Sequence, residues 1–218
     1  MVDFGRHKIL GLAMGLVLAL TSQATGASPA TADDDPIDLV MTEEWVLRDP
    51  NIPAAGNPDG DITIVEYLDV QCPYCKKVHA DLTEVAKEDG KIRIVYKEWP
   101  IFGGVSVYAA KLVQAARYQN KYVEAHDAVI TAKSKLTEDG VRDLLAKAGV
   151  DVPRAEADLK ANAKEIDSTL ARNALQARAF DFKGTPSFII GKFRVPGALD
   201  AALIKRAVAD ARAAKQGK

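Results

Sequence analysis

The feature that most constrains the fold of this chain is a β-branched and aromatic run that passes directly into a cysteine pair. The run "ITIVEYLDV" covers residues 62–70, and Cys72 and Cys75 follow it in the motif "CPYC". Residues of this kind favour a buried strand. Pro73 suits the first position of a helix because its φ angle is preset there, and apolar residues then recur at helical spacing to about Glu88. The sequence therefore predicts a strand-to-helix junction that carries both cysteines.

The pattern along the rest of the chain predicts a small mixed sheet with a helical insertion. A second strand is expected over 90–99, a helical block over 104–181 that includes a long helix from Pro153, a strand over 186–191 with a short strand after it, and a closing helix over 199–214. The first two strands need a crossover connection and are therefore parallel, whereas the last two form a hairpin. This order predicts an α/β fold with an inserted all-helical subdomain.

Residues 1–27 have the pattern of a cleaved signal peptide. Two basic residues precede twelve uncharged residues, "ILGLAMGLVLAL", and small residues follow. A membrane anchor is the alternative, but twelve residues in a helix rise only ~18 Å, which is less than a bilayer core of ~30 Å. Cleavage is expected after Ala24 or Ala27, and export would bring the cysteine pair into an oxidising compartment.

Residues 28–58 contain five prolines and are predicted to form an exposed arm ahead of a domain over 59–218. Within the arm, Trp45 is expected to be a packing residue, and a contact between subunits is the alternative. The formal net charge of the whole chain is only −1. Such a balance argues against nucleic acid or an anionic membrane as the main partner.

The cysteine pair can be interpreted in three ways, because the chain has only two cysteines. A structural disulfide closing so small a loop would stabilise little. Zinc would need further ligands beside Cys72, Cys75 and His79, although cuprous ion could accept two thiolates alone. A c-type haem needs histidine where Lys76 stands. Redox exchange is therefore favoured, with the disulfide itself in place of a cofactor and no metal, and copper binding or delivery is the non-enzymatic alternative.

The start of a helix is a favourable place for a redox thiolate. Its unpaired N–H groups and its dipole stabilise an anion, so the pKa of Cys72 is expected to fall into a range of roughly 3.5–7.5. Cys72 is then the predicted nucleophile and Cys75 the resolving cysteine, while Pro73 and Tyr74 set the redox balance of the pair. A disulfide that leaves a stabilised thiolate is an oxidant.

Two other positions are candidates for the same site. Glu66 lies six residues before Cys72, and a carboxyl group buried there would have a raised pKa and could exchange a proton with Cys75. The alternative for Glu66 is a solvent-facing position on an edge strand. Pro186 opens a predicted strand, where a cis Thr185–Pro186 bond would leave the Thr185 backbone free to pair with a peptide. An ordinary edge proline is the alternative.

These residues resemble a known family, the DsbA-like periplasmic thiol–disulfide oxidoreductases. The resemblance rests on "EYLDVQCPYC" followed by a helix and on "GTPSFIIG" some 110 residues later. It implies a thioredoxin-like fold over about 59–214, with the helical block capping the site. It also implies that Cys72 is the nucleophile, that Cys75 resolves, that Glu66 lies beneath them, and that Thr185–Pro186 is a cis-proline loop facing the disulfide.

The resemblance also implies a function. It predicts a periplasmic enzyme that introduces disulfides into exported proteins bearing cysteines and is reset by a membrane redox partner. One position departs from the best-known oxidase, which has histidine where this chain has Tyr74. Disulfide isomerase or reductase action is therefore the alternative. Isomerases of related type oligomerise through an N-terminal segment, and residues 28–58 could serve as one. His79 is expected to be a solvated helix residue, and His126 a surface or packing residue.

Overall fold

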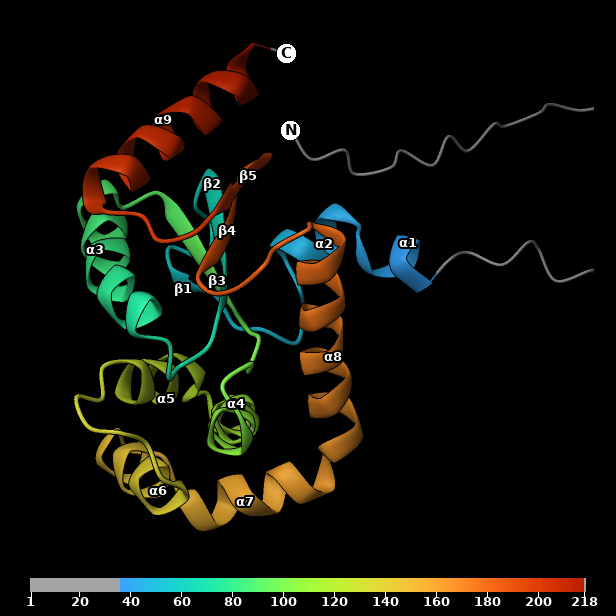
Figure 1. Ribbon diagram of the computed structural model, residues 1–218, viewed down its shortest axis with the longest axis vertical. Helices are drawn as coiled ribbons and strands as arrows, with labels where there is room; N and C mark the ends of the chain where they lie inside the picture. The colour runs from blue at the N-terminus through green and yellow to red at the C-terminus, as the bar shows by residue number, and fades with distance from the viewer. Residues whose placement is uncertain (1–35, 218) are drawn as a thin grey trace, which may run out of the picture.

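The fold is organised around a five-stranded mixed sheet in the order β1-β3-β2-β4-β5 (Figure 1). The computed structural model describes residues 36–217, so the predicted signal peptide lies outside the described residues. The strands are β1 (Ala55–Gly56), β2 (Ile62–Leu68), β3 (Ile92–Glu98), β4 (Ser187–Ile190) and β5 (Phe193–Pro196). β2 and β3 are parallel, β4 is antiparallel to β2, and β4 and β5 form the predicted hairpin.

Helices cover both faces of the sheet and form the insertion. They are α1 (Pro36–Val40), α2 (Glu43–Leu47), α3 (Pro73–Asp89), α4 (Gly104–Ala116), the 3₁₀ helix η1 (Arg117–Gln119), α5 (Tyr122–Ile130), α6 (Glu138–Lys147), α7 (Val152–Ala161), α8 (Ala163–Ala179) and α9 (Ala201–Gln216). In Figure 1, α3 and α9 lie on one side of the sheet and α2 and α8 on the other, while α4 to α7 form a separate layer at one end. The α/β mixed sheet with an inserted helical subdomain is confirmed.

The burial of β2 explains its sequence. All seven of its residues are buried, because neighbouring strands flank it on both edges and helices cover both faces. A strand in this position is expected to be a nearly continuous apolar run instead of an alternating one. The apolar run over residues 62–68 is therefore the central strand of the sheet.

One predicted helix is in fact two. The apolar spacing after Pro153 predicts a single long helix, but α7 ends at Ala161 and α8 begins at Ala163. Asn162 between them has φ −114° and ψ 23°, outside the helical region, and its side-chain amide donates to the Asp158 carbonyl at 2.9 Å. Such local bonds from asparagine compete with the helical pattern, and the chain turns there.

The exposure predicted for the N-terminal arm is wrong over most of residues 46–55. Val46, Leu47 and Ile52 are buried in the core, and the short strand β1 pairs antiparallel with β3. Gly56, the second residue of β1, has φ +66°, and a Cβ there would lie 2.6 Å from the Ile92 carbonyl oxygen. The prolines interrupt regular structure in this segment, but its apolar residues still pack on the domain.

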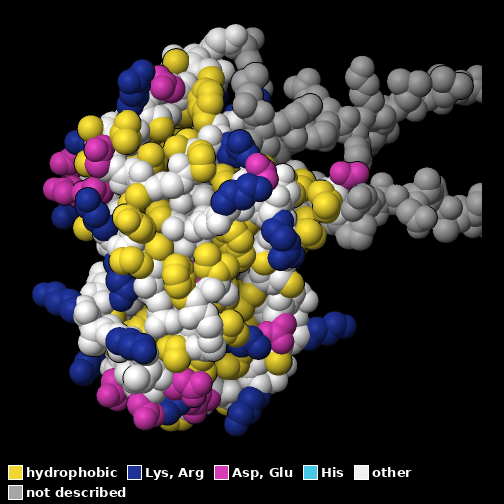
Figure 2. Space-filling view, in the orientation of Figure 1, with side chains coloured by type: hydrophobic (Ala, Val, Ile, Leu, Met, Phe, Trp, Pro, Cys, Tyr) yellow, Lys and Arg dark blue, Asp and Glu magenta, His cyan; other side chains and the backbone are white. Residues whose placement is uncertain are grey.

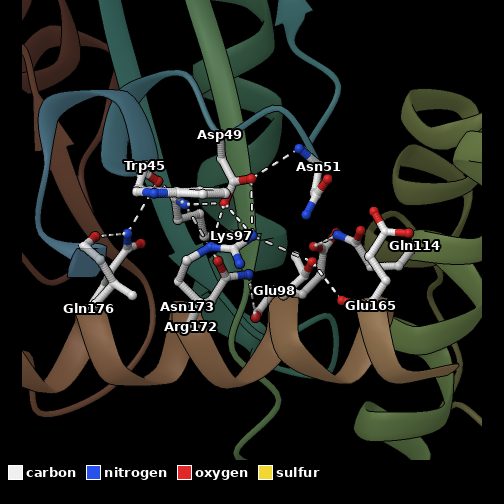
Figure 3. A network of polar contacts seen from close by, with 12 residues as sticks. Trp45, Asp49, Asn51, Lys97, Glu98, Gln114, Glu165, Arg172, Asn173 and Gln176 are labelled. Atoms are coloured by element: carbon white, nitrogen blue, oxygen red, sulfur yellow. Dashed lines mark hydrogen bonds and ion pairs between the residues drawn. The ribbon is translucent and has the colours of Figure 1, made fainter. Parts of the chain in front are cut away.

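A buried ion network fastens the arm to the sheet (Figure 3). Asp49 accepts hydrogen bonds from Lys97 Nζ at 3.2 Å and from the Arg172 guanidinium at 2.8 and 3.0 Å. Lys97 also donates to the Trp45 carbonyl at 2.8 Å. The Arg172 guanidinium lies 4.3 Å from the centre of the Trp45 ring, so Trp45 is a packing residue as predicted. Burial lowers the pKa of Lys97 to about 8, although Asp49 opposes this shift.

The surface of the described part carries charges of both signs. On the face drawn in Figure 2, acidic and basic side chains are interspersed with apolar ones. Within residues 36–217, no helix is both long enough and apolar enough to cross a bilayer.

Candidate functional site

The two cysteines lie at the start of α3, as the sequence predicts. Cys72 is the N-cap residue and Pro73 follows in the first turn. Both sulfurs belong to free cysteines with little exposed surface, 1% for Cys72 and 0% for Cys75. Tyr74 between them is 63% exposed. The motif thus exposes Tyr74 to solvent and buries both cysteines.

The surroundings of Cys72 favour its thiolate. The pKa of Cys72 is lowered to about 5, first by a hydrogen bond from the Cys75 thiol, against the opposing effect of burial. Thr185 and the backbone N–H groups of Cys75 and Tyr74 lower it further. The Thr185 hydroxyl is buried without a hydrogen-bond partner among residues 36–217, so it is free to donate to a thiolate. The Cys75 thiol is therefore the main cause of the lowered pKa, and the N–H groups at the start of α3 contribute in the predicted direction.

The Cys75 thiol has the opposite environment. Its pKa is raised by the hydrogen bond to Cys72, by burial and by the charge of Glu66. Two cysteines one helical turn apart therefore differ strongly in acidity. Such a division suits one sulfur that reacts as a thiolate and a second that holds a proton until it is needed.

Glu66 is a buried carboxyl group in the central strand. It is 1% exposed, and β3 and β4 flank β2 on either edge, so the solvent-facing alternative does not hold. Burial is the first cause that raises the pKa of Glu66 to about 8, and the charge of Cys72 is the second. At neutral pH the group is mostly protonated, and its own charge raises the pKa of Cys75.

The loop before β4 completes the site from the far end of the sequence. The Thr185–Pro186 peptide bond is cis, and the Cys72 thiol donates to the Thr185 carbonyl oxygen at 3.2 Å across 113 residues of sequence. Pro186 is buried and precedes β4, which lies between β2 and β5. The alternative of an ordinary edge proline is therefore excluded.

One organising residue was missed by the sequence argument. Asp69 accepts hydrogen bonds from the Ile101 and Phe102 N–H groups at 2.7 and 2.9 Å and from the Ser106 hydroxyl at 2.7 Å. It thereby ties the loop after β3 to the segment that leads into the cysteines. Ile101 and Phe102 are 45% and 52% exposed. An aspartate at the end of an apolar run was the only signal in the sequence.

His79 differs from its predicted solvated position. It is 5% exposed, and its Nε2 atom lies 3.3 Å from Asp127 Oδ1. His126 is fully buried, which agrees with a packing role, and its ring stacks on Tyr96 at 3.9 Å between centroids. His79 belongs to α3 and His126 to α5, and both are buried where these two helices pack against each other.

The described residues offer little to a metal ion beyond the two thiols. No group of three or more His, Cys, Asp or Glu side chains in residues 36–217 is arranged to hold one. Cuprous ion needs only two thiolates, so the copper alternative is a matter for titration.

Comparison with known proteins agrees with this geometry. A family model described as thioredoxin matches residues 49–210. A thioredoxin-like oxidoreductase from Silicibacter pomeroyi DSS-3 is 36% identical, with a TM-score of 0.75, and the match covers 79% of this chain and 98% of that one. The thiol-disulfide exchange protein alpha-DsbA2 from Wolbachia pipientis is 27% identical with a TM-score of 0.72, over 80% of this chain and 94% of the other.

Curated relatives are longer than this chain. A Na(+)/H(+) antiporter NhaA 1 from Mycolicibacterium gilvum is 27% identical over 156 residues, which is 70% of this chain and 25% of the antiporter. The chain thus spans about a quarter of the length of the curated relatives it matches. The family model and the solved relatives cover most of the described domain, and both point to the same chemistry. The chain belongs to the thioredoxin family, and it resembles a thioredoxin-like oxidoreductase and a DsbA-type thiol-disulfide exchange protein of known structure.

Proposed function

We propose that this chain is a disulfide oxidase, which passes the Cys72–Cys75 disulfide to cysteine pairs of exported proteins. The observation that carries the proposal is the position of Cys72 at the N-cap of α3, where its neighbours lower its pKa to about 5. A stabilised thiolate favours the reduced form of the enzyme, so the disulfide form is an oxidant. The disulfide itself serves as the redox group.

The proposed reaction begins when a substrate thiolate attacks Cys72 Sγ in the disulfide. Cys75 leaves as a thiolate and takes the proton of Glu66, which is mostly protonated at neutral pH because its pKa is raised to about 8. The second substrate thiolate then attacks the substrate sulfur of the mixed disulfide and releases the Cys72 thiolate. Two electrons have passed to the enzyme, and a membrane redox partner is proposed to remove them.

The surface around Cys72 suits extended, apolar substrate segments. The exposed side chains of Tyr74, Ile101 and Phe102 belong to the cysteine motif and to the loop that Asp69 ties to it. Exposed apolar side chains that cluster at a reactive group are typical of interaction sites. Cysteine-bearing chains that have not yet folded would offer matching apolar segments. The signal-peptide pattern of residues 1–27 supports a periplasmic location for the proposed reaction.

Isomerase or reductase action is the second candidate, because Tyr74 brings no positive charge to the Cys72 thiolate. Equilibration with glutathione buffers separates the two directions. An oxidase should have a reduction potential between about −180 and −120 mV, whereas a value near that of thioredoxin, about −270 mV, would overturn the proposal.

Three further measurements complete the test. Cys72→Ser should abolish oxidation of a reduced model protein, and Cys75→Ser should accumulate mixed disulfides with it. Titration of the reduced protein with cuprous ion addresses the copper alternative, which weak binding would exclude. The mass in solution tests oligomers through residues 28–58. A monomer would argue against isomerase action.

A further inference from the structure

We infer that Tyr96, His79 and Asp127 form a proton relay that joins Glu66 to solvent on the side of α3 away from Cys72. The inference rests on the proposed function, since it supplies the proton that Glu66 exchanges with Cys75. Each of these residues would bind and release a proton in turn, with bridging water between them. The relay residues position and pass protons and do not touch the substrate.

The need for such a path follows from the burial of Glu66. Its side chain is 1% exposed, yet the carboxyl group must regain a proton after every transfer to Cys75. A protein substrate bound over Cys72 would exclude water from that face. A second route that remains open under substrate would allow the proton to be replaced within the mixed disulfide.

The relay residues come from three neighbouring elements: Tyr96 from β3, His79 from α3 and Asp127 from α5. Glu66 and Tyr96 are paired in register on the parallel strands β2 and β3, so their side chains leave the same face of the sheet. His79 follows Cys75 by four residues and therefore lies on the same side of α3. The His79 ring is 5.8 Å from the Tyr96 ring between centroids.

The outer end of the path reaches solvent. His79 Nε2 is 3.3 Å from Asp127 Oδ1, and the Asp127 side chain is 47% exposed. Asp127 and Tyr96 both line a cleft of about 380 Å³ between β1, α3 and α5. The α3 residues that line it, Thr83, Ala86 and Lys87, belong to the C-terminal half of the helix, whereas Cys72 caps the N-terminus.

Unpaired polar atoms mark the path itself. Glu66 Oε1, the Tyr96 hydroxyl and His79 Nδ1 are buried and have no hydrogen-bond partner among residues 36–217. Buried polar groups are nearly always paired with protein or with ordered water, so bridging water is the partner expected here. Burial is the first cause that raises the pKa of Tyr96, and the charges of Glu66 and Asp127 raise it further, so the hydroxyl lies in the field of the first and the last carboxyl group of the path.

The proton balance of the relay is simple. Asp127 takes a proton from solvent and passes it to His79 Nε2, while His79 Nδ1 gives up a proton through water to the Tyr96 oxygen. The proton of Tyr96 passes in turn to Glu66 Oε1. Every relay group ends with the number of protons it began with, although His79 ends as its other tautomer, and one proton has moved from solvent to Glu66. The reverse order removes a proton when Cys75 is oxidised, and it returns His79 to its starting tautomer.

The test uses single-turnover reduction of the Cys72–Cys75 disulfide by a cysteine peptide, followed by stopped flow. Tyr96→Phe should slow the step by about tenfold or more, since proton transfer by positioned groups contributes at least that much. Added imidazole, a small diffusible proton carrier, should restore part of the rate. Tyr67→Phe is the matched control, because Tyr67 is equally buried but its hydroxyl donates to Gln176 at 3.0 Å. It should stay within twofold of the parent.

A surface variant keeps the test valid if the buried one fails to fold. Asp127→Asn should also slow the step, and Glu124→Gln, an exposed acid on the same helix, should not. The equilibrium constant with glutathione should not change in Asp127→Asn, because a relay affects the rate and not the end states. Parent-like rates in Tyr96→Phe and Asp127→Asn would overturn the relay. If the parent itself fails to exchange disulfides, the proposed function fails instead.

Discussion

Replacing Glu66 should stabilise the protein by an amount that depends on pH. The pKa of this carboxyl group rises from 4.5 to about 8 on folding. At pH 7 the unfolded chain ionises the group, while the folded chain keeps it mostly protonated. Each pH unit between 4.5 and 7 costs the folded state about 1.4 kcal/mol. The penalty at pH 7 is therefore about 3 kcal/mol, and Glu66→Gln removes it.

The sign of the effect fixes its pH window. Because the folded pKa of this acid is raised, the penalty is absent below the unfolded pKa of 4.5, grows as the pH rises, and is constant above about 8. Guanidinium unfolding of the reduced protein should follow this curve. The free energy gained by Glu66→Gln, relative to its value at pH 4, should reach about 3 kcal/mol at pH 7. A difference that stays flat over this range would refute the reasoning.

A second background separates the two causes of the shift. The charge of Cys72 is the smaller cause, after burial. In a Cys72→Ser, Cys75→Ser protein the thiolate charge is gone but Glu66 is still buried, so most of the pH-dependent gain should remain. Its complete loss in that background would show that Cys72 sets the pKa of Glu66.

Three further outcomes are expected. Thr185→Val should raise the pKa of Cys72 by about one unit, because a hydrogen bond to a charged group contributes about 1.5 kcal/mol or more. The ultraviolet absorbance of the thiolate, followed against pH, measures this pKa. An unchanged pKa would contradict the role of the Thr185 hydroxyl. Asp49→Asn should destabilise the fold by about 3–5 kcal/mol, because Lys97 and Arg172 lose their counter-charge. A much smaller decrease in the free energy of unfolding, measured with denaturant, would show that the network contributes little. Gly60→Ala should cost about 1–3 kcal/mol in the same assay, since its Cβ would lie 2.6 Å from the backbone of β3. Gly104→Ala, where a Cβ meets nothing within 4 Å, is the matched control.

Local patterns predicted the parts of the fold that local physics determines. The run over 62–70 is apolar because β2 is buried on both faces, and Pro73 begins α3 because it loses no hydrogen bond there. The parallel pair and the terminal hairpin follow from connection lengths. The position of the cysteine site could also be predicted from local patterns. Cys72 lies between a recognisable strand and a recognisable helix start, so its place in the fold follows from theirs.

Pairs of side chains that are distant in sequence could not be predicted from the sequence pattern. Lys97 appears as one of the polar residues of an alternating strand, yet it is fully buried because Asp49, 48 residues away, supplies its counter-charge. His79 likewise appears solvated until α5 covers α3. The break at Asn162 was hidden because apolar spacing continues across it. The burial of Lys97 and His79 depends on partners that are distant in sequence, and the helix break depends on a single side-chain hydrogen bond of Asn162.

The two faces of the sheet use buried polar groups in opposite ways, and β3 links them. Lys97 points to the face where Asp49 forms ion pairs with both Lys97 and Arg172. The preceding residue, Tyr96, points to the other face, where its hydroxyl has no partner among the described residues. A fully paired cluster has no atom free to pass a proton, whereas an unpaired one needs water and can do so. The paired cluster therefore holds the strand in place, and the strand in turn fixes Tyr96 beside Glu66.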